Sequence, residues 1–258
     1  MDRSRQIAAI ADTDEERMLL VRVLDKLERA QQREMPASTG FLSPREQALL
    51  TQIMPNCLFF GGVEGADRRV AYYLPEYLTA EDFFDDGPVS CLRAEFYEEN
   101  SLTHRDILGA LMGAGIRRDA VGDICLRARD CDIFVLSELS RYLLDNLTGA
   151  GRQHLRLKII PLSQAVKQAQ EMKELRVTVA TMRLDSVLAA GFHLSRGAAT
   201  EAIRAGLASV DSLTCMKPDR LMSVSNEISL RGKGKLRILS VDGITRKGRQ
   251  GVTLGIYL

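Results

Sequence analysis

The stretch RLDSVLAAGFHLSRGAATEAIRAGLASVDS, residues 183–212, decides the fold of the last third of this 258-residue chain. Residues 183–188 open a short helix, which we expect to end at Gly191. Ser195 is the expected N-cap of a second short helix, because its hydroxyl can accept a hydrogen bond from the first turn. Gly206 is the expected left-handed residue that ends this second helix.

Short strands follow this helix pair. We expect strands over 207–210 and 213–214, joined by a tight turn, and a further pair over 227–230 and 236–241. The loop Arg-Gly-Lys-Gly-Lys at 231–235 connects the further pair, and its glycines allow close approach to a phosphate backbone. The pattern predicts a small α+β module with two short helices and a sheet.

The run at 183–212, together with EISLRGKGKLRI at 227–238, resembles the RNA-binding domain named after ribosomal small-subunit protein S-four. That family has RLD, then SR, then alanine, isoleucine and glycine, and a strand that ends in Val-Asn-Gly. This chain has Val210-Asp211-Ser212 there instead, and Asn226-Glu227 where Gly-Asp is usual. Both departures lie at turns, so they put the turn conformation in doubt more than the fold.

This resemblance implies a basic surface that fits duplex RNA by shape and phosphate contact, without reading base edges. We expect its cations to converge on one side of the module, while Asp185 orients neighbouring basic groups. Without the motif, the simpler interpretation is a solvated charged face, with Ser195 only a cap. The expected RNA-binding residues are Arg183, Ser195, Arg196, Arg204, Lys217, Arg231, Lys233 and Lys235.

The middle of the chain alternates between strand and helix patterns. The expected order is βαββαβ, which is the ferredoxin-like arrangement also used by RNA-recognition modules. Such modules stack bases on sheet aromatics, but Phe134 is the only aromatic residue on the two expected central strands. Base stacking is therefore not expected here. The expected elements cover 89–96, 104–112, 121–126, 132–136, 138–147 and 155–161.

Three runs in this region, at 104–111, 115–118 and 121–124, resemble the middle of the bacterial YlmH-like proteins. Those proteins combine N-terminal helices, a ferredoxin-like domain and the terminal RNA-binding module. The likeness implies ribosomal RNA or ribosome-bound tRNA as partner. Arg105, Arg117 and Arg118 either extend the RNA surface or form a charged loop paired with nearby aspartates, and the sequence leaves both interpretations open.

The N-terminal region is expected to be helical over 1–54, with a break at 38–40 and a second helix that starts at Ser43-Pro44. Residues 57–63 and 69–74 predict a β-hairpin. The fold class is therefore α+β in three parts. These are a helical region with a hairpin at 1–75, a ferredoxin-like domain at 76–165 and the RNA-binding module at 182–258, with residues 162–181 connecting the last two.

Charge is distributed unevenly, which favours a polyanionic partner for the C-terminal module. Residues 182–258 hold 12 Lys and Arg against 6 Asp and Glu, a net charge of +6, whereas residues 1–181 have a net charge of −5. Five unpaired cysteines and three isolated histidines indicate neither a disulfide framework nor a metal site. The chain has no apolar leader and no run of about 18 apolar residues, so we expect a cytoplasmic protein without a membrane contact.

No catalytic motif or cofactor motif is recognisable. Gly232-Lys233-Gly234-Lys235 lacks the spacing of a phosphate-binding loop, and Gly61-Gly62 leads into a hairpin rather than a helix. We therefore expect a non-enzymatic RNA-binding protein without a cofactor, acting in translation or in the rescue of stalled large subunits. The alternatives are an RNA-modifying enzyme with polar groups converging near Arg105, Asp106 and Asp123, and a cell-division-associated protein that binds a protein partner through its N-terminal region.

Overall fold

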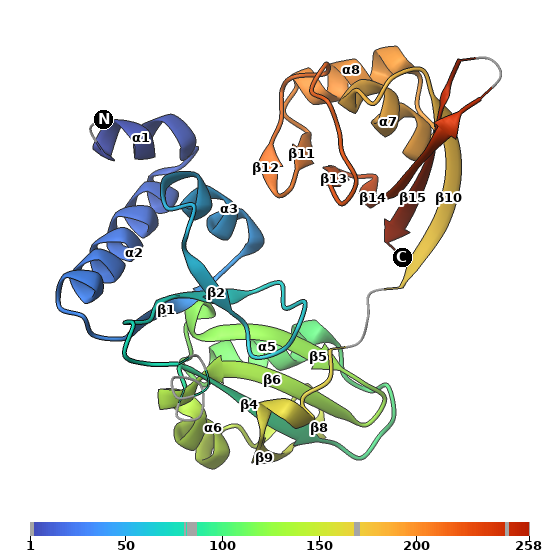
Figure 1. Cartoon of the computed structure of the whole chain (residues 1–258). Coiled ribbons are helices and arrows are strands. Elements are labelled where there is room, and N and C mark those ends of the chain that lie inside the picture. The colour runs from blue at the N-terminus through green and yellow to red at the C-terminus, as the bar shows by residue number, and fades with distance from the viewer. Residues whose placement is uncertain (1–2, 80, 82–86, 168–170, 246–247, 258) are drawn as a thin grey trace. The chain divides into compact units, whose positions relative to one another are not determined.

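The computed structural model describes residues 3–79, 81, 87–167, 171–245 and 248–257 of the chain (Figure 1). It divides into two compact units, Met1–Gln168 and Ala169–Leu258, which are described separately. None of the helices within the described residues combines the length and the apolar character that a membrane span requires.

Unit 1 contains three N-terminal helices, a small three-stranded sheet and a four-stranded sheet with two helices. Among the residues that the structure describes, its α-helices are α1 (Arg3–Ile10), α2 (Asp14–Gln32), α3 (Pro44–Ile53), α5 (His104–Gly113) and α6 (Ser140–Asn146). Its longer strands are β1 (Ala37–Leu42), β2 (Leu58–Phe60), β3 (Arg69–Tyr73), β4 (Val89–Glu95), β5 (Val121–Leu126), β6 (Asp130–Leu136) and β9 (Arg156–Ile160), and the two-residue strands β7 (Gly149–Ala150) and β8 (Gln153–His154) pair with each other.

Local signals set the N-terminal helices, but the predicted break at 38–40 is wrong. Thr13 caps α2, and Ser43 forms a capping box with Glu46 at the start of α3. Residues 38–40 instead lie inside β1, which pairs with β3. The hydroxyl of Thr39 accepts a hydrogen bond from the backbone N–H of Ala71 at 2.9 Å, so a tertiary partner stabilises a segment that reads locally as a turn.

The four-stranded sheet has the order β5-β6-β4-β9, with antiparallel pairing throughout. Between β4 and β9 the longer elements follow in the expected order of strand, helix, strand, strand, helix and strand. Leu92 and Ile133 of the central strands pack with Ile107 and Leu111 of α5 and Leu143 of α6. One face of the sheet is therefore buried beneath the two helices.

The other face of this sheet is largely occupied as well. Phe134 of β6 and Cys91 of β4 lie there in a second apolar cluster with Phe41 of β1 and Val70 of β3. The N-terminal strands and the four-stranded sheet thus share a core. The prediction that this sheet offers no base-stacking surface is consistent with this packing, because its central aromatic side chain is completely buried.

β5 and β1 approach each other closely at Gly122, where a Cβ atom would lie 2.6 Å from the ring of Phe41. Replacing Gly122 with alanine is expected to lower the free energy of unfolding of unit 1 by about 1–3 kcal/mol, because the ring or the strand must shift. Gly109 in α5 is the matched control, since its Cβ position is open and alanine favours a helix by about 0.5–1 kcal/mol. Urea denaturation of both variants tests this, and equal stabilities would contradict it.

Unit 2 is a six-stranded antiparallel sheet with two short helices. The strand order is β10-β15-β14-β13-β11-β12. The elements are β10 (Met172–Val179), α7 (Leu184–Gly191), α8 (Arg196–Arg204), β11 (Ala208–Val210), β12 (Leu213–Thr214), β13 (Glu227–Leu230), β14 (Gly234–Ile244) and β15 (Gln250–Tyr257). β10, which lies in the segment expected to connect the last two domains, is an edge strand of this sheet.

The predicted local signals of the module are confirmed. Ser195 caps α8 by accepting a hydrogen bond from the N–H of Ala198 at 3.1 Å. Gly206 has the left-handed conformation, with φ of +72°. Asp211 and Ser212, which replace Asn-Gly, also have positive φ values of 50° and 68°, so the turn keeps the conformation that suits a tight hairpin.

Candidate nucleic-acid interface

The sheet of unit 2 has one face covered by helices and one open face. Ile228 and Leu236 occupy facing positions on β13 and β14, and both are completely buried with Leu188 of α7 and Ile203 of α8. Because side chains alternate along a strand, the neighbours of Ile228 and Leu236 point away from the helices. The predicted RNA-binding residues therefore divide between two opposite surfaces of the module.

On the helix side, a recess forms between α7, α8 and the loop at 217–220. Two backbone hydrogen bonds hold this loop against the start of α7. The N–H of Leu184 donates to the carbonyl oxygen of Arg220 at 2.8 Å, and the N–H of Asp185 donates to the carbonyl oxygen of Pro218 at 3.0 Å. We call this the α7–α8 recess. It is lined by Arg183, Asp185, Arg196, Gly197, Thr200, Glu201, Arg204, Pro218 and Asp219.

Asp185 organises the recess from its floor. Its carboxylate is almost completely buried and accepts hydrogen bonds from Arg183 at 3.1 Å and from Arg196 at 3.3 Å, each measured from the guanidinium Nη2 to Oδ2. Each guanidinium also donates from Nε at 3.3 Å, and the hydroxyl of Ser186 donates to Oδ1 at 3.1 Å. The expectation that Asp185 orients basic neighbours is met, because it holds Arg183 at the N-cap of α7 and Arg196 at the start of α8.

The protonation of Asp185 follows from these contacts. Burial raises the pKa of its carboxyl group, but the hydrogen bonds from Arg183, Ser186 and Arg196 outweigh burial and hold the pKa below its usual value. Asp185 is therefore charged at neutral pH. Glu201 and Asp219 also line the recess but make no ion pair with these arginines among the described residues, and the Arg196 side chain remains 58% exposed and available to an anionic ligand.

Other cations border the recess without internal partners. Arg204 lines it from the end of α8, and its exposed side chain makes no ion pair among the described residues. Lys217 and Arg220 are exposed on the bordering loop. Sequence reasoning missed Arg220. No local sequence signal places it at the recess, because the loop returns to the start of α7 only through tertiary hydrogen bonds.

Lys235 lies on the opposite side of the module from the recess. Its ammonium group is 2.7 Å from a carboxylate oxygen of Glu227, which also pairs with Arg237 at 3.1 Å. The same carboxylate accepts a hydrogen bond from the hydroxyl of Tyr257 at 2.7 Å. The Lys235 ammonium also lies over the Tyr257 ring, 4.8 Å from its centroid.

The expectation that all cations of the module converge on one side is therefore wrong. Arg183, Arg196 and Arg204 lie at the recess, whereas Lys235 lies on the open sheet face. Arg231 and Lys233 are exposed at the turn between β13 and β14. The physical reason is the two-residue period of a strand, which sends Lys235 to the face opposite its buried neighbour Leu236.

The three unit-1 candidates have different surroundings. The Arg118 guanidinium donates to the carbonyl of Val121 at 2.6 Å, and burial lowers its pKa, so it has a structural role. Arg117 pairs with Asp119 at 2.5 Å. The exposed side chain of Arg105 has no hydrogen bond or ion pair within the described part of the chain. Whether these arginines touch RNA stays a prediction.

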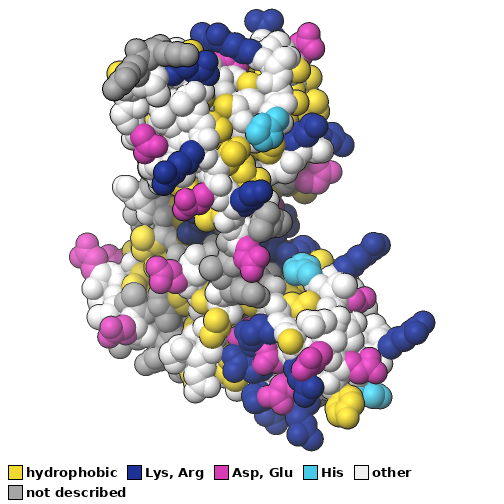
Figure 2. All heavy atoms as spheres, turned by 90° about the vertical axis from the view of Figure 1, so that its right-hand side faces the viewer, with side chains coloured by type: hydrophobic (Ala, Val, Ile, Leu, Met, Phe, Trp, Pro, Cys, Tyr) yellow, Lys and Arg dark blue, Asp and Glu magenta, His cyan; other side chains and the backbone are white. Residues whose placement is uncertain are grey.

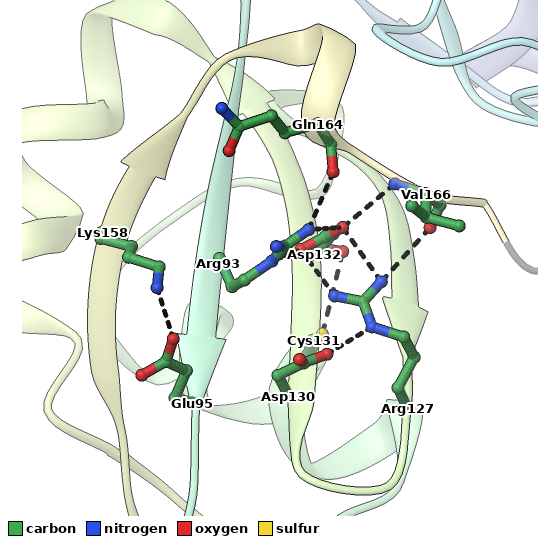
Figure 3. Close-up of polar contacts among 9 residues, drawn as sticks. All are labelled: Arg93, Glu95, Arg127, Asp130, Cys131, Asp132, Lys158, Gln164 and Val166. Carbon is green, nitrogen blue, oxygen red and sulfur yellow. Dashed lines mark hydrogen bonds and ion pairs between the residues drawn. The ribbon is translucent and has the colours of Figure 1, made fainter.

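Sequence reasoning missed an ionic cluster in unit 1 (Figure 3). Asp132 of β6 is completely buried and accepts two hydrogen bonds from Arg93, at 2.7 and 2.8 Å, and two from Arg127, at 2.9 and 3.0 Å. The backbone N–H of Val166 adds a fifth bond at 3.2 Å. Burial raises the pKa of Asp132, but the two arginines outweigh burial and lower it to about 2.

The carboxylates considered for catalysis are engaged in structural contacts. Asp106 closes a capping box with Thr103 at the start of α5. Asp123 accepts hydrogen bonds from the backbone N–H groups of Asp67 and Arg68, at 2.8 and 2.9 Å, and pairs with Lys167 at 3.0 Å. These groups hold loops together, which is not the arrangement expected of an acid–base pair that converges on a substrate.

Charge alone does not mark the interface. On the face shown in Figure 2, Lys and Arg side chains are interleaved with Asp and Glu, and hydrophobic side chains form only small areas. The α7–α8 recess is distinguished by geometry, because arginines of two helices meet at one buried carboxylate.

Comparisons with known proteins agree with a role for RNA. A family model described as a putative RNA-binding domain in YlmH matches residues 95–164. Over 220 residues, the chain is 30% identical to the ribosome-associated protein quality control protein P2 of Bacillus subtilis (strain 168), covering 83% of this chain and 85% of that relative. The solved structure of the cell division protein ylmH from Streptococcus pneumoniae covers 61% of this chain and 98% of its own, with 21% identity and a TM-score of 0.49.

Proposed function

The chain belongs to the YlmH family, as its motifs predicted, and from this membership we propose that it binds structured RNA on the ribosome without catalysing a reaction. Its partner in this proposal is ribosomal RNA or ribosome-bound tRNA. The setting is translation, in particular the rescue of stalled large subunits. The printed name of the Bacillus subtilis relative, a ribosome-associated quality control protein, supports this setting.

The observation that carries the proposal is the meeting of Arg183 and Arg196 on Asp185 in the α7–α8 recess. A guanidinium group that is already oriented by a carboxylate loses little conformational freedom when a phosphate binds. Arg204 adds a third cation at the same recess. Arginines fixed in this way suit the regularly spaced phosphates of an RNA duplex, which a protein recognises mainly by shape and charge.

Unit 1 has a supporting role in this proposal. We infer that its four-stranded sheet with two helices is a ferredoxin-like domain whose sheet face stabilises the N-terminal strands. Since Phe134 is buried there, any RNA contact of this unit comes from exposed arginines such as Arg105 and Arg117. Phosphate contacts of this kind add affinity without sequence preference.

Sedimentation with ribosomal particles tests the proposed function. We expect the full chain to pellet with large subunits at physiological salt and to be released as salt rises, because phosphate contacts weaken with salt. A control variant checks that the loss of any two exposed cations does not abolish binding. In it, exposed Arg33 and Arg141 of unit 1 are changed to alanine, and it should pellet like the wild type. A wild-type protein that stays in the supernatant at all salt concentrations contradicts the ribosomal part of the proposal.

A further inference from the structure

The open face of the unit-2 sheet carries a row of cations and flat or flexible apolar groups. Glu227 pairs in register with Arg237, and Ser229 with Lys235. Ser209 of β11 stands opposite Ser229. These side chains all point away from the helices, since their strand neighbours form the buried core.

The strand-like pairing continues beyond β11 and β13, so that residues next to these strands also have side chains on the open face. The N–H of Cys215 donates a hydrogen bond to the carbonyl oxygen of Ala208 at 3.0 Å. The N–H of Arg231 donates one to the carbonyl oxygen of Leu207, also at 3.0 Å. By alternation from buried Ala208 and Cys215, Leu207 and Met216 lie on the open face, where they are 40% and 61% exposed. A set of large exposed apolar side chains beside Arg231 needs an explanation, because folding alone does not favour it.

Tyr257 is the aromatic residue of this face and is held in place. Its hydroxyl is bonded to Glu227, and the same carboxylate holds Lys235 and Arg237 beside the ring, with the Arg237 guanidinium 5.9 Å from the ring centroid. Ser209 and Ser229, which face each other in the middle of the open face, have small side chains that project only a short way from the sheet. The result is a shallow surface with an oriented ring and cations at one side and aliphatic groups at the other.

We propose that this open sheet face is a second RNA contact surface that takes unpaired nucleotides. Arg176, Arg231, Lys235 and Arg237 outnumber the two carboxylates of Glu174 and Glu227 on the strands of this face, which favours a polyanion over an acidic or neutral protein surface. Exposed Leu207 and Met216, together with the part of the half-buried Tyr257 ring that Lys235 does not cover, offer surfaces on which bases that have left a helix can pack.

This inference rests on the proposed function, because it assigns the duplex to the α7–α8 recess on the other side of the module. The two surfaces are separated by the core of unit 2. An RNA that fills both has a duplex next to a single-stranded segment. The preferred ligand is therefore a duplex with unpaired nucleotides at its end, rather than an uninterrupted duplex.

Fluorescence anisotropy with the full chain tests the inference. The probes are a blunt RNA hairpin, the same hairpin with a six-nucleotide unpaired extension, and a third hairpin whose extension is abasic. We expect the wild type to bind the extended hairpin about tenfold more tightly than the blunt hairpin, since each stacked base adds affinity. The abasic extension should regain only a small part of that preference, because it supplies phosphates without bases.

The variant is R231A combined with Y257L, which removes an exposed cation and the ring but keeps apolar bulk. We expect it to bind the blunt hairpin like the wild type and to lose the tenfold preference for the extension. The matched control R204A, at the recess, should weaken binding to all hairpins equally and keep the preference. A melting temperature within about 2 °C of the wild type checks that the variant folds.

Two outcomes overturn the inference while leaving the proposed function intact. These are equal binding of blunt and extended hairpins by the wild type, and a preference that survives in the double variant. If the wild type shows no preference for the extension but the double variant no longer pellets with large subunits, the face binds a ribosomal protein instead. Failure of the wild type to bind any hairpin or to pellet with subunits overturns the proposed function itself.

Discussion

A variant with Arg183, Arg196 and Arg204 changed to alanine is expected to bind structured RNA about 10²–10³-fold more weakly than the wild type. A typical hydrogen bond contributes on the order of 0.5–1.5 kcal/mol net, and about 1–1.5 kcal/mol for each of the three solvent-accessible contacts gives this loss, since every 1.4 kcal/mol is a factor of about ten in affinity. The three side chains line one recess, so the same RNA segment loses all three contacts. Anisotropy titrations across a range of salt concentrations measure the effect.

The salt dependence supplies an independent readout for the same variant. Each lost phosphate contact lowers the slope of log affinity against log salt by about 0.9, so the triple variant should lose roughly 2–3. The control removes three exposed arginines of unit 1, Arg22, Arg33 and Arg141, and with them the same net charge. An equal loss of affinity in the control means that overall charge, and not the recess, determines binding.

Removing both arginine partners leaves Asp185 buried without compensation, so folding has to be examined separately. A second variant changes the same three arginines to lysine. It keeps the charge that neutralises Asp185 but loses the planar, forked donors of the guanidinium group. We expect an intermediate loss of about tenfold. Wild-type affinity in the lysine variant would show that point charges suffice and that the orientation imposed by Asp185 is irrelevant.

Changing Asp132 to alanine is expected to destabilise unit 1 by about 3–5 kcal/mol. The substitution leaves the Arg93 and Arg127 guanidinium groups partly buried, at 21% and 26% exposure, with the shared carboxylate gone. It also frees the N–H of Val166, which ties the end of unit 1 to its sheet. Five of the six tyrosines lie in residues 1–168, so tyrosine fluorescence during urea unfolding reports mainly on this unit.

Asp130 is the matched control for Asp132, because it also pairs with Arg127 but its side chain is 34% exposed. Its replacement by alanine should cost less than about 1 kcal/mol, as expected for a pair near the surface. Comparable losses from both substitutions would mean that burial of Asp132 does not determine the effect. In that case the cluster in Figure 3 is an ordinary surface network.

The pH dependence of stability gives a further test of Asp132. Because folding lowers its pKa from 3.8 to about 2, the contribution of Asp132 is fully present above about pH 4 and is lost as pH falls through that interval. A shift of this size corresponds to about 2 kcal/mol. The acid-induced loss of unit-1 stability between pH 4 and pH 2 should therefore be smaller by about that amount in a D132N variant than in the wild type.

Local sequence determined most of the helices and strands of this protein, with β1 as an exception. Ser43 and Ser195 cap helices where the sequence predicted it, and Thr13 caps α2 in the same way, because a cap needs only a hydroxyl and the next turn of backbone. The order of strands and helices from β4 to β9 follows from patterns of hydrophobic residues within short windows. The motifs at 183–212 and 104–124 also led to the family.

Only the tertiary structure decided which charged groups meet. Asp132 joins Arg93 across two strands, and Asp185 joins Arg196 across two helices. β1 forms against its local turn signal because β3 pairs with it. The cations of the C-terminal module divide between the recess and the open sheet face because strand register and helix packing set the side on which each side chain emerges. Register and packing depend on contacts between residues far apart in the chain, which no short window of sequence contains.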